Sequence, residues 1–321
     1  MLLCGLLRRS ASVRLGDARQ EISLALNIAM LTRPPMRRPP HSGVGHNRKS
    51  LVVAPKLART GNVITLAGDS VCLSFALRMS RPEQIAVVIP CLNEGRTIGP
   101  LIREIRQFLP NIIVVDDGST DSTRSEAERA RAIVISHETS QGKGASLRAG
   151  MELALNHGFV WALALDGDGQ HSPADIPKFL SAAESSTAAM FIGNRMENAG
   201  TMPLLRRIVN RWMSRMIGEF CDVDIPDSQC GFRMVDLNAW KRLPMSSHHF
   251  EIESEMIVRF LHAGYSIDFV PVQTRYASET SKIRPMRDTV RWIRWWFSVR
   301  NELAVLPVHP RYESTPQDAT T

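Results

Sequence analysis

Two aspartates separated by one glycine form the most chemically informative motif in this sequence. They lie in Asp166-Gly167-Asp168-Gly169-Gln170, directly after an apolar run. Alternate residues of an extended segment point the same way, so both carboxylates can face one cation. Hard oxygen ligands suit Mg²⁺ or Mn²⁺, which also hold substrate phosphates. An Asp/Gly turn between a strand and a helix uses the same residue types, so the motif alone leaves both interpretations open.

A second acidic pair, Asp116-Asp117, also follows an apolar run. In doubly wound folds an acidic residue at such a place commonly accepts hydrogen bonds from a ribose or a base. The structural alternative is a helix cap, which Ser119 or Asp121 would supply. A cap needs only one acidic residue, so two adjacent aspartates favour a binding role.

Gln141-Gly142-Lys143-Gly144 precedes a helical pattern and resembles a phosphate-binding turn. It lacks the glycine spacing of a P-loop, and Leu147 breaks the G-x-G-x-x-G dinucleotide pattern. A Rossmann dehydrogenase is therefore disfavoured. Lys143 either neutralises a phosphate of the donor or is an ordinary solvated lysine.

Short apolar runs alternate with helical patterns from residue 85 onward, which predicts an α/β fold with a mostly parallel sheet covered on both faces. The predicted strands are Ile85–Pro90, Ile112–Val115, Ala132–Ser136 and Val160–Leu165, and the predicted helices are Thr97–Leu109, Ser122–Arg131 and Gly144–His157. Ligands of such sheets bind beyond the carboxyl ends of the strands. Three of these ends carry Asn93-Glu94, Asp116-Asp117 and the Asp166/Asp168 pair, which predicts one shared site.

The basic charge of the chain is concentrated in its first quarter. Residues 1–80 contain 12 Lys/Arg and 3 Asp/Glu, whereas the remainder has 27 basic and 29 acidic residues. This distribution argues against nucleic acid as a partner. We expect residues 1–80 to be an extension outside the fold: a transit peptide, a basic disordered tail, or sequence upstream of a true start at Met79. The expected catalytic domain is 81–300, followed by a tail, 301–321.

The five cysteines form no CxxC pair, which favours a reducing compartment over a disulfide framework or a zinc site. No apolar stretch is long enough to predict a transmembrane helix. We therefore expect a cytoplasmic protein that associates peripherally with the inner face of a membrane.

The motifs, taken in order, resemble those of family 2 glycosyltransferases, and within them the polyprenyl-phosphate hexose synthases of the dolichyl-phosphate mannose synthase type. The similarity extends over about residues 85–297. It rests on the motifs above and on later segments: Gly193-Asn194-Arg195, Asp227–Arg233, Phe250–Glu255 and Thr280–Pro285. Two departures are Asp-Gly-Asp-Gly-Gln in place of Asp-Ala-Asp-Leu-Gln, and no carboxyl-terminal membrane helices.

The resemblance implies a single GT-A-type domain that uses a nucleoside-diphosphate sugar, a GDP- or UDP-hexose, together with Mg²⁺ or Mn²⁺. It implies a donor site formed by Pro90, Asn93, Glu94, Asp116, Asp117, Lys143, Asp166 and Arg195. Asp166, Asp168 and Gln170 would hold the metal. Arg195, Arg233, Ser281, Lys282 and Arg284 would surround an acceptor phosphate, and Asp168, Asp227 and Arg233 are the expected catalytic residues.

The nature of the acceptor decides which further groups are needed. The leading hypothesis is inverting transfer of a hexose to polyprenyl phosphate at the cytosolic membrane face. A lipid phosphate is already an anion and needs a basic clamp, which Arg275, Lys282, Arg284 and Arg287 would supply. A hydroxyl acceptor, on another lipid or a saccharide, would need a carboxylate base: Glu251, Glu253, Glu255 or Asp227. The three glutamates could instead form a solvated helix face. A non-enzymatic alternative is a nucleotide-binding scaffold.

Two amphipathic segments bear on where the acceptor binds. In Leu204–Phe220 the apolar stripe is expected to pack on the core. In Arg287–Arg300, Trp292, Trp295 and Trp296 lie beside arginines, a pattern typical of an anionic membrane surface. The histidines His171, His248 and His249 are expected to be structural or surface residues.

Overall fold

The computed structural model describes residues 82–275 and 285–304. The extension expected over residues 1–80 and most of the tail 301–321 lie outside the described residues. The same holds for three expected acceptor residues: Ser281, Lys282 and Arg284.

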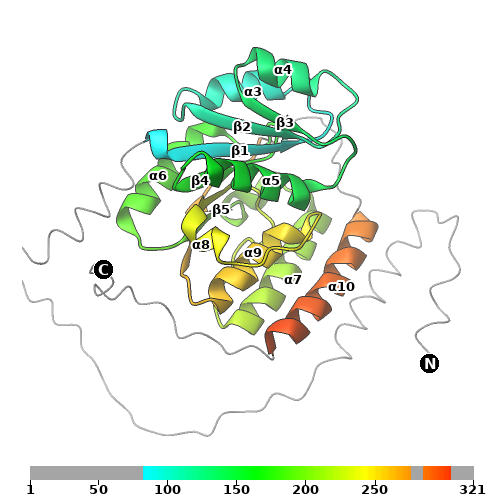
Figure 1. The fold of residues 1–321 in the computed structure, drawn as a ribbon. Coiled ribbons are helices and arrows are strands. Elements are labelled where there is room, and N and C mark those ends of the chain that lie inside the picture. The colour runs from blue at the N-terminus through cyan, green and yellow to red at the C-terminus, as the bar shows by residue number, and fades with distance from the viewer. Residues whose placement is uncertain (1–81, 276–284, 305–321) are drawn as a thin grey trace, which may run out of the picture. The chain divides into compact units, whose positions relative to one another are not determined.

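A seven-stranded sheet forms the centre of the described part (Figure 1). Its strand order is β3-β2-β1-β4-β6-β5-β7, and β6 runs antiparallel to both of its neighbours while the remaining pairs are parallel. The strands are β1 (Ile85–Cys91), β2 (Asn111–Asp116), β3 (Ile133–Ser136), β4 (Trp161–Ala164), β5 (Met190–Asn194), β6 (Arg233–Asp236) and β7 (Ile267–Pro271). The predicted mostly parallel α/β sheet is confirmed.

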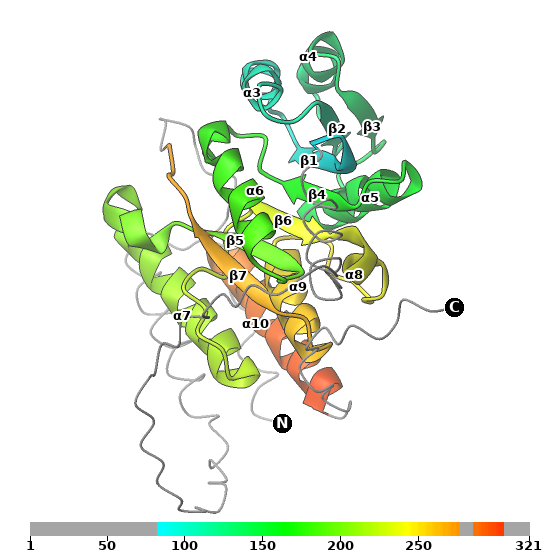
Figure 2. The ribbon, with the colours of Figure 1, turned by 90° about the vertical axis from the view of Figure 1, so that its left-hand side faces the viewer.

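Helices connect the strands and cover both faces of the sheet (Figure 2). They are α3 (Ile98–Ile105), α4 (Thr123–Arg129), α5 (Lys143–Asn156), α6 (Ile176–Ser185), α7 (Leu204–Cys221), α8 (Leu237–Lys241), α9 (Glu251–His262) and α10 (Pro285–Ala304), with short 3₁₀ turns η2 (Pro82–Gln84), η3 (Pro173–Asp175) and η4 (Met196–Thr201). Each helix and strand predicted from the alternating pattern is present, with bounds shifted by a few residues.

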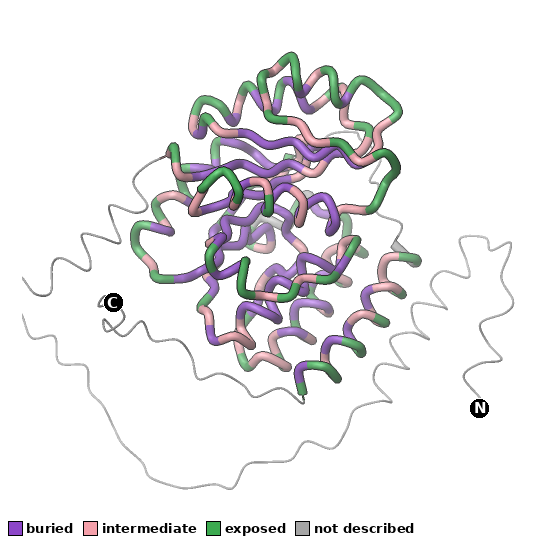
Figure 3. The backbone as a smooth tube through the Cα atoms, in the orientation of Figure 1, coloured by how far each residue is buried: buried purple, intermediate pink, exposed green. Residues whose placement is uncertain are grey.

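The central strands are buried almost throughout, as the tube coloured by burial shows (Figure 3). Helix α5 covers β1 and β2 at close range. Gly150 permits this approach, because a Cβ atom at its position would clash with the side chain of Val88. The buried sheet therefore provides a rigid support for the loops that leave its strand ends.

Three helices, α7, α9 and α10, pack together beside the second half of the sheet (Figure 1). Trp292 and Trp296 of α10 are each only 2% exposed, and they contact Trp212 and Phe220 of α7. The Trp292 Nε1 group donates a hydrogen bond to Ser254 Oγ in α9 at 2.8 Å. The expectation that these tryptophans anchor the chain in a membrane is therefore wrong, because they form the contact between helices.

The apolar stripe of α7 divides into two parts. Met213 and Ile217 are buried, as expected for a stripe that packs on the core. Leu204, Leu205 and Ile208, in the first two turns, are 61%, 47% and 51% exposed. The expectation that the whole stripe is covered is wrong for this amino-terminal end.

No helix in residues 82–275 and 285–304 combines the length and the apolar character that a membrane span requires.

Candidate active site

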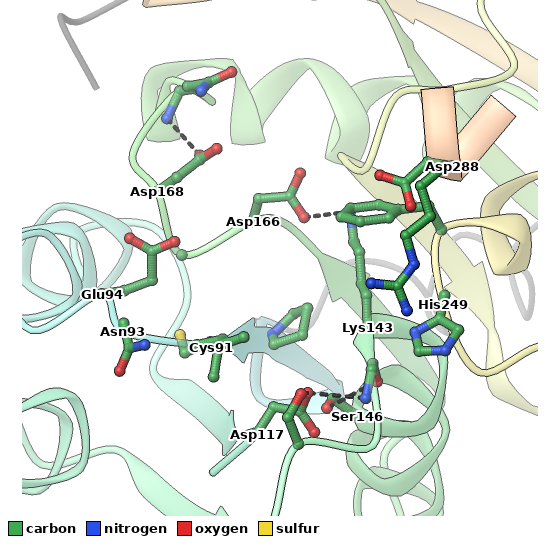
Figure 4. A pocket seen from close by; sticks show the side chains of 18 of the residues that line it. Cys91, Asn93, Glu94, Asp117, Lys143, Ser146, Asp166, Asp168, His249 and Asp288 are labelled. Atoms are coloured by element: carbon green, nitrogen blue, oxygen red, sulfur yellow. Dashed lines mark hydrogen bonds and ion pairs between the residues drawn. The ribbon is translucent and has the colours of Figure 1, made fainter. Parts of the chain in front are cut away.

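A cavity of about 740 Å³ opens at the carboxyl ends of β1, β2 and β4 (Figure 4). Its walls come from the loops after these strands, from the start of α5, and from α7, the loop before α9, and α10. The lining residues are Pro90, Cys91, Leu92, Asn93, Glu94, Asp117, Ser140, Gly142, Lys143, Ser146, Asp166, Gly167, Asp168, Gln170, Arg206, His249, Phe250, Arg287, Asp288 and Arg291. The structure thus brings the three predicted strand-end motifs into one site.

Asp117 is held rigidly at the edge of this cavity. Its carboxylate accepts hydrogen bonds from the backbone N–H groups of Gln141 and Gly142, both at 2.9 Å, and from Ser140 Oγ at 2.7 Å. A nitrogen of the His137 ring lies 2.7 Å from Oδ1. Burial alone would raise the pKa of Asp117, but these hydrogen bonds lower it below its ordinary value of 3.8. Asp117 is therefore a fixed anion.

Hydrogen bonds join the loops that follow β1 and β2. Asn93, which has a φ of 54°, donates its backbone N–H to Ser119 Oγ at 2.9 Å and accepts from the Thr120 N–H at 2.8 Å. Asp116 is buried, accepts a hydrogen bond from the Ser119 N–H at 3.0 Å, and is not among the lining residues. Of the adjacent pair, only Asp117 lines the cavity, and Asp116 supports the turn.

Asp166 and Asp168 both line the cavity, but their side chains have different partners. An oxygen of Asp166 lies 2.5 Å from the Lys143 ammonium, whereas Asp168 accepts a hydrogen bond from the Gln170 N–H of its own turn at 2.9 Å. Burial raises the pKa of Asp168, and the negative charge of Asp166 raises it further. Asp166 stays ionised, because Lys143 and His171 outweigh the effect of burial and hold its pKa far below the ordinary range.

These carboxylates fit the divalent cation that the sequence implies. Within the described residues, no group of three or more His, Cys, Asp and Glu side chains is arranged as a complete metal site. Mg²⁺ in phosphate-transferring sites commonly uses one or two carboxylates, with substrate phosphates and water as its other ligands. Asp166 and Asp168 match that requirement, because they are neighbouring carboxylates that repel each other and are open to a cavity.

Most backbone N–H groups at the amino terminus of α5 are already bonded to protein acceptors. The Gly144 and Ala145 N–H groups both donate to the carbonyl oxygen of His248, at 2.8 and 3.2 Å. The preceding Gly142 N–H is bonded to Asp117. The structure therefore gives no support for phosphate binding by the N–H groups of Gln141, Gly142 and Gly144. The alternative of a solvated Lys143 is wrong, because its side chain is only 12% exposed.

Arg195 and Asp227 form a buried ion pair away from the cavity wall. The Arg195 guanidinium donates to both oxygens of Asp227, at 2.8 and 2.9 Å, and Asn210 adds a third hydrogen bond at 2.8 Å. Burial would raise the pKa of Asp227, but Arg195 lowers it below 3.8. Neither residue is among those that line the cavity, so the structure does not place them at the expected donor, acceptor or catalytic positions.

Arg233 is likewise a buried structural residue. It is 1% exposed, and its guanidinium donates to the carbonyl oxygens of Cys230, Ser228 and Glu253. Because burial disfavours its charge, its pKa is lowered. Arg233 does not line the cavity, although contact with an acceptor phosphate would require it to do so.

The glutamates of α9 are not on a solvated face. Glu251, Glu253 and Glu255 are all buried, so that alternative is wrong. Glu253 binds Lys143 at 2.6 Å, and Glu255 accepts hydrogen bonds from Arg259 and from the Ser246 and Ser247 N–H groups. Neither these three glutamates nor Asp227 lines the cavity.

A basic group on the helical side of the cavity was only partly anticipated. Arg206 from α7 and Arg287 and Arg291 from α10 line the same cavity as the aspartates. Only Arg287 belonged to the basic cluster expected from sequence. Arg275 of that cluster instead pairs with Glu104 at 3.0 Å on the surface. A signal was present in the arginines of both amphipathic segments, but sequence could not show which of them face the cavity.

His249 also lines the cavity, whereas the sequence suggested only a structural or surface residue. Partial burial lowers its pKa, and the positive charge of Arg291 lowers it further. His171 is buried, as expected of a structural residue, with Nε2 3.6 Å from Asp166.

The α/β sheet and the acidic cavity at its strand ends place the candidate site where ligands of such folds bind. The family model described as "Glycosyl transferase family 2" matches residues 86–242. A Haloferax volcanii protein, glycosyltransferase AglJ, is 31% identical over 215 residues, which cover 65% of this chain and 70% of that protein. The chain belongs to glycosyltransferase family 2.

A second relative and a solved structure extend the comparison. The chain is 28% identical to the UDP-N-acetylglucosamine–dolichyl-phosphate N-acetylglucosaminyltransferase of Methanococcus voltae, over 60% of this chain and 86% of that protein. Glucosyl-3-phosphoglycerate synthase from Mycobacterium tuberculosis, solved with Mn²⁺, uridine diphosphate and phosphoglyceric acid, superposes with a TM-score of 0.55 at 19% identity, covering 78% and 85% of the two chains. The GT-A fold and the resemblance to enzymes with polyprenyl-phosphate acceptors are thereby confirmed.

Proposed function

We propose that this glycosyltransferase moves a hexose from a nucleoside-diphosphate sugar to a polyprenyl phosphate, with inversion and with a divalent cation. One observation carries the proposal. A single cavity contains fixed carboxylates from the strand ends (Asp117, Asp166 and Asp168) and arginines from α7 and α10 (Arg206, Arg287 and Arg291). Carboxylates suit the hydroxyl groups of a nucleoside and a phosphate-bound cation, whereas arginines suit a second anion.

In this proposal, Asp117 orients the nucleoside, and Asp166 and Asp168 hold the cation. That cation would neutralise charge on the departing diphosphate. The bond between the anomeric carbon and the diphosphate breaks, and its electron pair leaves with the nucleoside diphosphate. An oxygen of the acceptor phosphate supplies the electron pair of the new bond. Arginines around the acceptor would hold that phosphate in line without removing a proton from it.

The cavity offers little support for a hydroxyl acceptor. Such an acceptor needs a carboxylate base, and none of the four that sequence suggested lines the cavity. Asp288, which does line it, lies 3.3 Å from the Arg291 guanidinium. If Asp288 were that base, a hydroxyl acceptor would make it essential, whereas a phosphate acceptor would leave it dispensable for the proton.

The relatives support the lipid phosphate and the metal. The Methanococcus voltae enzyme acts, as its name states, on dolichyl phosphate with a UDP-sugar, and the Mycobacterium tuberculosis structure holds Mn²⁺ with uridine diphosphate. We extend both properties to this chain, with the donor nucleotide and the sugar left to experiment.

Apolar side chains on the helices beside the cavity support peripheral contact with the inner face of a membrane. In the described part of the chain, six large hydrophobic side chains are exposed, and five of them lie on α7 and α10: Leu204, Leu205, Ile208, Val290 and Phe297. Arginines accompany them on both helices. Basic helices with exposed apolar side chains bind anionic bilayers.

The test is a transfer assay with UDP- and GDP-hexoses, Mn²⁺ or Mg²⁺, and three acceptors: polyprenyl phosphate, the unphosphorylated polyprenol and 3-phosphoglycerate. We expect a sugar–phosphate–polyprenyl product by mass spectrometry with the first acceptor alone. Transfer to polyprenol instead, with its loss in Asp288→Asn, would overturn the acceptor assignment. Nucleotide binding without transfer to any of these acceptors would leave a binding scaffold as the better description.

A further inference from the structure

The ammonium group of Lys143, a residue of the cavity wall, lies between two carboxylates. It is 2.5 Å from Asp166 Oδ1 and 2.6 Å from Glu253 Oε1. The Asp166 side chain is 29% exposed and faces the cavity, whereas that of Glu253 is 5% exposed. Lys143 thus joins an accessible carboxylate to an inaccessible one.

The surroundings of this group leave the ammonium little room. A Cβ atom at Gly231 would lie 2.7 and 2.9 Å from the Asp166 oxygens and 2.9 Å from Lys143 Nζ. The Phe250 ring covers another side, with its centroid 5.6 Å from Nζ. Burial would lower the pKa of Lys143, but the two carboxylates raise it well above the ordinary value. Lys143 is therefore a fixed positive charge.

Asp166 would have to share its carboxylate between Lys143 and a divalent cation. Its Oδ1 contacts Lys143, and its Oδ2 lies 3.6 Å from His171 Nε2. A cation at Asp166 and Asp168 would either displace the Lys143 ammonium from Oδ1 or bind beside it. The ammonium would repel the cation in both cases. A diphosphate arriving with the cation would offer Lys143 a new anionic partner.

We propose that Lys143 is the counter-ion of Asp166 in the nucleotide-free protein. When a divalent cation binds, the Lys143 ammonium forms its ion pair with the donor diphosphate instead. Glu253 acts as a positioning residue, because it keeps the ammonium within reach of both anions. The consequence is positive coupling: the cation alone binds weakly, and the cation and the diphosphate strengthen each other. This inference rests on the proposed use of a nucleoside-diphosphate donor.

The test measures Mn²⁺ binding by titration calorimetry and by electron paramagnetic resonance of free Mn²⁺, without acceptor or turnover. Lys143→Met should tighten binding of Mn²⁺ alone by about tenfold, since it removes a charge-assisted competitor. Lys143→Arg should retain weak binding. Arg206→Met is the matched control: it removes a positive charge from the same cavity that is not bonded to Asp166, and should change Mn²⁺ binding by less than about twofold.

Saturating UDP or GDP, whichever binds, should tighten Mn²⁺ binding to the wild-type protein by about tenfold more than it does in Lys143→Met, where only direct coordination of Mn²⁺ by the diphosphate couples the two ligands. Unchanged or weaker Mn²⁺ binding in folded Lys143→Met would overturn the inference and make the ion pair a simple support of Asp166. An equal gain in Arg206→Met would overturn it as well, by showing a general charge effect.

If Lys143→Met does not fold because Glu253 is left unpaired, the double variant Lys143→Met/Glu253→Gln tests the same gain. Failure to transfer a sugar to polyprenyl phosphate would sink the proposed function without affecting these binding results, so the two failures are distinguishable.

Discussion

The strand-end side and the helical side of the cavity are built in different ways. On the strand-end side, Asp117 and Asp168 are fixed by backbone N–H groups of loops that leave a buried sheet. On the helical side, Arg206 and Arg287 project from α7 and α10, which are far apart in sequence. The difference teaches that the strand-end half is a rigid product of the sheet, whereas the helical half depends on how two helices pack.

This contrast matches what the two halves are proposed to bind. A nucleoside diphosphate is a charged ligand, and it binds more tightly to protein groups that are already held in position. A polyprenyl phosphate brings a long apolar chain, and the helices that supply the arginines also carry the exposed apolar side chains Leu204, Leu205 and Ile208. The predictions below test whether the two halves have separable roles.

The largest effect is expected from Asp168→Asn on the strand-end side. Removal of a charged ligand of the cation should lower turnover by about a thousandfold. The melting temperature should change little, because the carboxylate bonds to its own turn through the Gln170 N–H. Steady-state kinetics and thermal unfolding measure the two effects. Wild-type turnover with an intact metal requirement would place the cation elsewhere.

Asp227→Asn should affect folding more than substrate binding. It leaves Arg195 buried with a weakened partner and should reduce the free energy of unfolding by about 3–5 kcal/mol at pH 7. Because the folded-state pKa of Asp227 is below 3.8, its stabilisation is fully present above pH 3.8 and is lost as the pH falls through the folded value. The difference between wild type and variant should therefore shrink below pH 3.8.

Urea unfolding at several pH values measures this difference. Asp224→Asn, the same substitution at an exposed position three residues away, is the control and should have little effect. A stable Asp227→Asn protein that loses only turnover would instead support the catalytic role expected from sequence.

Arg206→Ala and Arg287→Ala should separate the two substrates. Each should raise KM for polyprenyl phosphate about tenfold to a hundredfold, because each removes a charge-assisted contact with phosphate, while KM for the nucleotide sugar stays within about twofold. Lys282→Ala and Arg284→Ala, outside the described residues, are predicted to behave likewise. Arg294→Ala, exposed on α10 and not among the lining residues, is the control. Equal changes in both KM values would place these arginines on the donor diphosphate.

The smallest effect is expected from the exposed end of α7. Leu204→Ser, Leu205→Ser and Ile208→Ser combined should reduce binding to phosphatidylglycerol-containing vesicles by about tenfold, because less apolar area enters the bilayer. The melting temperature should be unchanged. Ile133→Ser, at an exposed hydrophobic residue of β3, is the matched control for sedimentation with vesicles. Equal loss in both variants, or none in either, would remove α7 from the membrane contact.

The sequence by itself determined the sheet and the strand-end half of the site. Apolar runs separated by helical patterns predicted β1, β2 and β4, because a strand buried on both faces must be apolar throughout, and they also predicted the edge strand β3. Parallel strands place their carboxyl ends at one edge of the sheet, so Asn93, Asp117 and Asp166 had to meet there. Local pattern and topology were sufficient for this half.

Only the tertiary structure decided the other half. Arginines and tryptophans repeat along Arg287–Arg300, and periodicity shows which of them share a face but not what that face meets. Packing against α7 and α9 buries Trp292 and Trp296 and turns Arg287 and Arg291 toward the cavity. The hydrogen bond from Arg233 to the Glu253 carbonyl oxygen and the Lys143–Glu253 ion pair likewise join segments far apart in sequence. Charge and spacing alone cannot show whether a basic residue meets a ligand or a buried partner, because that depends on contacts between distant segments.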